Sequence, residues 1–130
     1  MAPHQPLPEA PDAQFEWFHA LAELLDKHGP VAVNADTRSA MLRFVTEHLP
    51  GHTFPDEEDT NAFIESVQRL RESERTWNKA LQAAIISACD RAEAGNPHVA
   101  ANNLEHFASS CPWALFARVA RGQASQFIAL

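Results

Sequence analysis

Residues 96–122, NPHVAANNLEHFASSCPWALFARVARG, decide the fold of this chain. The stretch reads as two short helices that open at Pro97 and Pro112, because proline suits the first helical position, where no intrahelical partner exists for its missing N–H. We expect Gly122 to end the second helix. The side chains expected to face inward are Val99, Ala100, Leu104, Phe107 and Ala108 in the first helix, and Trp113, Phe116, Ala117 and Ala120 in the second.

Upstream of this stretch, apolar side chains recur every three or four residues, which predicts amphipathic helices. The first helix is expected to begin with Asp12 as its cap and to end at the Gly-Pro pair of residues 29–30. The second is expected to begin at Asn34 or Asp36 and to run to about His48. Both are therefore of ordinary length for a small helical protein.

Two further helices are predicted between residues 55 and 94. Pro55 suits the first turn of one helix, and the acidic residues after it would lie at the positive end of its dipole. The polar segment 71–76 predicts a break or bend, since one helix from 56 to 94 would be unusually long. The next helix has the clearest periodicity in the chain and is expected to end at Gly95.

The composition predicts the all-α class. The chain has 130 residues, frequent alanine, four glycines and no tyrosine, a mixture that favours helix over sheet. We predict a compact single-domain bundle of five to six helices at residues 12–130, preceded by a flexible proline-rich arm at residues 1–11.

Charge is distributed unevenly along the chain. Its net charge is −7, which disfavours generic binding to nucleic acid or to anionic membranes. Residues 1–66 hold twelve acidic and three basic side chains, whereas residues 67–130 hold five acidic and seven basic ones. Such asymmetry indicates a polarised surface. No apolar run approaches the ~20 residues of a membrane-spanning helix, and the N-terminus does not resemble a signal peptide, so we expect a cytoplasmic protein with free thiols.

Two charged segments and one tryptophan are the candidate partner-binding residues. The acidic run of residues 56–59 either starts a helix or docks a basic partner. The basic stripe beyond it is either a solvated helix face or a surface for an acidic partner, including the acidic half of a second copy. Trp17 lies off the main apolar face of the first helix and is expected to be partly exposed. The predicted partner-binding residues are Trp17, Asp56, Glu57, Glu58, Asp59, Arg71, Arg75 and Lys79.

Two alternative hypotheses assign metal binding or catalysis to particular residues. His48, His52 and Asp56 could converge on a metal ion. Cys111, next to Pro112 at an expected helix N-terminus, could be an activated thiol with His106 as its base. Neither set matches a known signature, so we predict no metal, no cofactor and no catalytic residue.

The leading hypothesis is a non-enzymatic protein–protein interaction module, such as a small regulatory, accessory or inhibitor-type protein. A protein partner is expected, and a homodimer is an alternative. The second hypothesis is a metal-binding protein or a thiol enzyme that uses the residues just named. The third is a DNA-binding regulator that uses the stripe Arg71, Arg75 and Lys79, which the net charge makes the least favoured.

Overall fold

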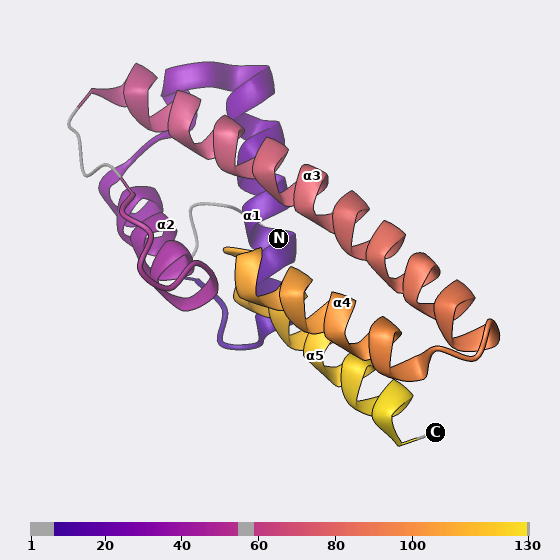
Figure 1. Ribbon diagram of the computed structural model, residues 1–130. Coiled ribbons are helices and arrows are strands. Elements are labelled where there is room, and N and C mark those ends of the chain that lie inside the picture. The colour runs from indigo at the N-terminus through magenta and orange to yellow at the C-terminus, as the bar shows by residue number, and fades with distance from the viewer. Residues whose placement is uncertain (1–6, 55–58, 130) are drawn as a thin grey trace. The chain divides into compact units, whose positions relative to one another are not determined.

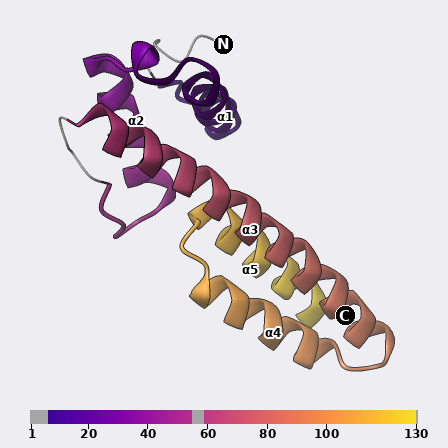
Figure 2. The ribbon, with the colours of Figure 1, turned by 90° about the horizontal axis from the view of Figure 1, so that it is seen from above.

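The structure is a computed structural model that describes residues 7–54 and 59–129. It divides into two units, Met1–Ser73 and Glu74–Leu130. The described residues form five α-helices, one 3₁₀ helix and no strand, which confirms the predicted all-α class (Figures 1 and 2). The elements are α1 (Pro11–His28), η1 (Gly29–Ala32), α2 (Ala35–His48), α3 (Thr60–Glu93), α4 (Pro97–Ser110) and α5 (Ala114–Ile128).

Several predicted helix ends are confirmed, and the chemistry behind them is visible. Asn34 caps α2, since its side-chain oxygen accepts a hydrogen bond from the Thr37 N–H at 2.8 Å. α1 ends at Gly29, whose φ of 61° lies in the region that glycine tolerates best. At the other end of α1, the prediction that Asp12 is the cap is wrong. Pro11 is already helical and Ala10 is the N-cap, so Asp12 lies in the first turn.

The first unit has an aromatic core between α1 and α2. Phe44 on α2 stacks on Phe18 of α1, with ring centroids 4.6 Å apart, and meets Phe15 edge-on at 5.3 Å. Leu21, Leu25 and Met41 are almost completely buried nearby in the same unit. Burial of each such side chain contributes about 1.5–3 kcal/mol relative to exposure, so the apolar stripes of α1 and α2 stabilise this unit.

The predicted break at residues 71–76 is wrong, because α3 is one helix of 34 residues. The segment is polar but contains good helix formers, arginine and glutamate, and no glycine or proline. A polar stretch without a breaker can stay helical when its backbone bonds along the helix. α3 therefore supplies residues 60–73 to the first unit and residues 74–93 to the second.

In the second unit, α4 follows α3 through a tight turn at Gly95, and α5 lies beside α4 (Figures 1 and 2). Trp77 of α3 meets Phe107 of α4 edge-on, with centroids 5.7 Å apart. Small residues let α4 and α5 approach closely. The buried side chains of these two helices are Ala100, Ala101, Leu104 and Ala108 in α4, and Phe116, Ala117, Ala120 and Ala124 in α5.

Three predictions for this unit are wrong. α5 begins at Ala114 rather than Pro112, with the fully buried Trp113 as its N-cap residue. It also continues through Gly122 to Ile128. Glycine costs about 1 kcal/mol in a helix, which the buried Ala124 and the half-buried Phe127 beyond it offset. Val99, expected inside, is 41% exposed.

None of the helices in the described part of the chain combines the length and the apolar character that crossing a membrane requires. The predicted division between an arm and a domain at residue 11 stays a prediction, and residues 1–6 lie outside the described part. Leu7 is buried, with 5% of its surface exposed.

The continuity of α3 can be tested by amide hydrogen exchange. We expect the amides of residues 71–76 to exchange slowly, like those of the neighbouring turns of α3, because each is hydrogen-bonded within the helix. His98 and Val99 serve as the fast-exchanging control, because they are exposed and their N–H groups lie in the first turn of α4, before the first backbone bond of that helix, from Ala100 to Asn96. Fast exchange at 71–76 with non-helical carbon chemical shifts would contradict a continuous α3.

Candidate functional site

The three residues of the predicted basic stripe all lie on α3. Arg75 and Lys79 are exposed and belong to the second unit, whereas Arg71 is half-buried and belongs to the first. Their four-residue spacing on a continuous helix places them along one side of it. Whether they bind a partner remains a prediction.

Of the predicted acidic patch, Asp59 is in the described part of the chain, and Asp56, Glu57 and Glu58 lie outside it. The Asp59 side chain accepts hydrogen bonds from the backbone N–H groups of Asn61 at 2.9 Å and of Ala62 at 3.4 Å. These bonds satisfy N–H groups that the helix itself leaves without partners. Asp59 therefore has a structural role at the start of α3.

The prediction that Trp17 is partly exposed is wrong, because its side chain is completely buried. Its ring centroid lies 6.4 Å from that of Phe44. At 100° per residue, the buried positions of α1 cover an arc of roughly 160°, wider than the stripe that three- and four-residue spacing suggests. Trp17 lies at one edge of that arc and belongs to the core, so it is not available on the surface of the chain.

An exposed apolar residue that the sequence reasoning missed lies on α3. Ile86 is 63% exposed, the largest value among the exposed large hydrophobic side chains of the described residues. It lies on the same face of α3 as Arg75 and Lys79. From residue 75 to residue 93, exposed residues recur on this face at alternating steps of four and three. This spacing marks one helix face. We call this set the α3 stripe: Arg75, Lys79, Gln82, Ile86, Cys89 and Glu93.

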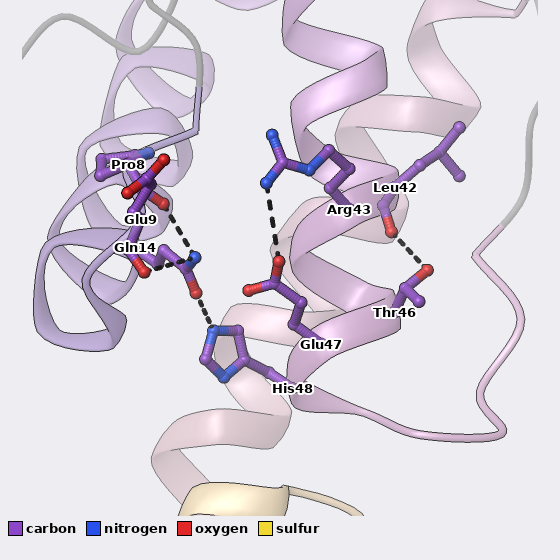
Figure 3. Close-up of polar contacts among 8 residues, drawn as sticks. All are labelled: Pro8, Glu9, Gln14, Leu42, Arg43, Thr46, Glu47 and His48. Carbon is purple, nitrogen blue, oxygen red and sulfur yellow. Dashed lines mark hydrogen bonds and ion pairs between the residues drawn. The ribbon is translucent and has the colours of Figure 1, made fainter.

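A buried polar link joins α1, α2 and the segment before α1 (Figure 3). The Gln14 side-chain nitrogen donates to the backbone oxygens of Pro8 at 2.8 Å and Glu9 at 3.4 Å. The amide oxygen of Gln14 therefore faces His48, whose Nε2 lies 2.5 Å away. Since an amide oxygen can only accept, Nε2 of His48 carries the hydrogen. The Phe15 and Phe44 rings flank this imidazole, with centroids at 4.6 and 4.7 Å.

The two histidines of the predicted metal set have different environments. His48 is buried and bonded to Gln14, His52 is exposed, and Asp56 lies outside the described residues. Within residues 7–54 and 59–129, no three histidine, cysteine or carboxylate side chains are placed to hold a metal ion.

The two thiols have opposite environments. Cys89 is exposed on α3, and Cys111 is buried. Burial raises the pKa of the Cys111 thiol, and a 3.7 Å hydrogen bond to the Trp113 carbonyl oxygen offsets this only partly. Cys111 follows the end of α4 and lies three residues before α5. The helix N-terminus that was expected to lower its pKa is therefore not next to it, and His106 is exposed on α4.

The chain matches no family model, and no curated protein or solved structure shows significant similarity to it.

Gln14→Ala should destabilise the protein by about 1–3 kcal/mol, because it leaves the buried His48 N–H without its acceptor. The measurement is urea unfolding followed by circular dichroism. Glu16→Ala, an exposed change on the same helix, is the matched control and should alter stability by less than ~0.5 kcal/mol. Equal effects of the two substitutions would contradict the role given to the Gln14–His48 bond.

We expect the two thiols to react with a disulfide reagent at very different rates. Cys89 should react rapidly in the folded protein and Cys111 at least about tenfold more slowly, because Cys111 is buried and its raised pKa lowers the thiolate fraction. The difference should disappear in denaturant. Cys89→Ser should remove the fast phase alone, and a remaining fast phase in that variant would contradict the burial of Cys111.

Proposed function

We propose that this chain is a non-enzymatic interaction module that binds a protein partner through the α3 stripe. The observation that carries the proposal is Ile86, which is 63% exposed in line with the basic side chains of Arg75 and Lys79. A small regulatory, accessory or inhibitor-type role in the cytoplasm is the broader function proposed with it.

The composition of the stripe fits what protein interfaces use. An aliphatic anchor gains free energy when a partner covers it, and flanking charged groups select the partner and speed its approach. Arg75 and Lys79 favour an acidic partner surface at the N-terminal end of the stripe. Lysine and arginine stems can also cover apolar surface while their charged ends remain in water.

A single exposed aliphatic residue is common on protein surfaces, so the position of Ile86 matters more than its exposure. It lies within the stripe, where seven and eleven residues separate it from Lys79 and Arg75 on the same helix face. The buried Leu81 and Ala88 mark a different face of the same helix, the one that contributes to the core. α3 thus has one face committed to the core and another that a partner can reach.

Lys79→Glu and Ile86→Ala should each weaken retention of the partner at least about tenfold, which corresponds to about 1.4 kcal/mol. The measurement is quantitative capture of proteins from an extract of the native host by the tagged chain. An untagged copy of the chain that the tagged copy retains counts as a partner. The matched controls are Arg118→Glu and Val119→Ala on α5, which repeat the charge reversal and the truncation at exposed positions outside the stripe. If the stripe variants and their controls retain the same proteins in the same amounts, the stripe is not the binding surface.

A further inference from the structure

The α3 stripe is polarised along its length in a way that complements itself. Its N-terminal end carries the basic Arg75 and Lys79, its middle carries Gln82 and Ile86, and its C-terminal end carries Glu93. We propose, resting on the interaction function above, that the partner on this stripe is a second copy of the chain. The two α3 helices would pack antiparallel, so that the basic end of each lies against the acidic end of the other.

The spacing of the stripe fits helix-on-helix packing. Its six residues alternate steps of four and three, the spacing that keeps side chains on one face of a helix, where a second helix can lie against them. All six are exposed in the chain. From residue 75 to residue 93 the stripe is about 27 Å long at 1.5 Å per residue, and it lies entirely within the second unit.

One register satisfies the charges and the apolar residue together. With the two-fold axis at residue 84, Arg75 lies opposite Glu93 of the other copy, and Glu93 lies opposite its Arg75. The same register places Gln82 opposite Ile86, and Ile86 opposite Gln82, on either side of the axis. Such reciprocal contacts are what a two-fold symmetric dimer requires.

The remaining layer of this register places Lys79 opposite Cys89. The acidic Asp90 follows Cys89 in sequence and is exposed as well, so the Lys79 ammonium meets a carboxylate beside the thiol. Ala83 is exposed beside the stripe near the axis, and its small side chain allows the two helices to approach closely.

A parallel pairing is disfavoured by the same charges. In register, it would place Arg75 against Arg75, Lys79 against Lys79 and Glu93 against Glu93. Juxtaposed like charges oppose association. The antiparallel arrangement converts each of these repulsions into an attraction or removes it.

The expected dimer is weak and depends on salt. Only one aliphatic side chain per copy lies in the stripe, and the ion pairs at its ends remain partly solvated, where each contributes little. We therefore expect a dimer that dissociates on dilution and whose dissociation constant increases with ionic strength, because exposed charges are screened.

Charge reversal tests the pairing. By sedimentation equilibrium of the purified chain, Arg75→Glu and Glu93→Arg should each weaken dimerisation at least about tenfold, because one reversal turns both ion pairs of the symmetric dimer from attractive to repulsive. The double variant Arg75→Glu/Glu93→Arg should recover most of the affinity, because it exchanges the two ends of the same ion pair. Arg118→Glu, exposed on α5, is the control and should leave the dimer unchanged. Circular dichroism establishes that each variant keeps its helices.

A disulfide tests the register without relying on the charges. In Lys79→Cys, the new thiol should lie opposite the native Cys89 of the other copy, so mild oxidation should give a dimer that reducing agent separates. Adding Cys89→Ser should abolish this crosslink. Ala80→Cys, exposed one step of about 100° around the helix, should crosslink much less. In a parallel pair, Cys89 would instead crosslink to Cys89 of the other copy in the unmodified chain. The variant Lys79→Cys/Cys89→Ser would also crosslink, because the thiols introduced at position 79 would face each other.

The outcomes separate this inference from the proposed function. A chain that stays monomeric at high micromolar concentration and low salt would overturn the dimer, as would a double charge reversal without rescue or crosslinks of the parallel pattern. If the dimer is overturned but the stripe variants retain less of a different protein in the capture experiment, the proposed interaction function still holds. If they lose nothing, both are overturned.

Discussion

The unbroken backbone hydrogen-bond ladder of α3 is the constraint on which the rest of the structure depends. Because the helix continues through its polar segment at residues 71–76, the period of 3.6 residues carries over from Thr60 to Glu93 without a shift of phase. That period determines which side chains reach the core, such as Leu81 and Ala88, and which remain in solvent, such as Lys79 and Ile86.

Elsewhere in the chain, burial outweighs local preference. Gly122 is a poor helix residue, yet α5 passes through it and buries Ala124 on the next turn. His48 and Gln14 are polar, yet both are buried, because they hydrogen-bond to each other and Gln14 also donates to the Pro8 carbonyl oxygen. A buried polar pair of this kind costs little when complete and much when broken.

The helices and most of their ends were predictable, because the deciding signals are local: the Asn34 cap, the glycines at 29 and 95, and Pro97 at the start of α4. The errors arose where the outcome depends on packing. Trp17 was assigned to the surface because a narrow apolar stripe cannot reveal how wide an arc the neighbours of α1 cover. The basic residues of the candidate surface were visible in the sequence as a charged series. Ile86 was missed, because one aliphatic residue off the apolar face of a helix carries no pattern that marks it as exposed.

The central claim is that a second copy packs antiparallel along the α3 stripe, and the distance between the two Cys89 residues of a dimer measures it directly. Spin labels attach to Cys89 selectively, since Cys111 is buried. In the antiparallel register the two Cys89 α-carbons are about 17 Å apart, from ten residues of helical rise and an interaxial distance of ~8–10 Å. We predict a distribution of label-to-label distances centred near that value and broadened by the flexible linkers of the labels. Absence of any intermolecular coupling, or the contact of about 10 Å or less that a parallel pair would give, would contradict it.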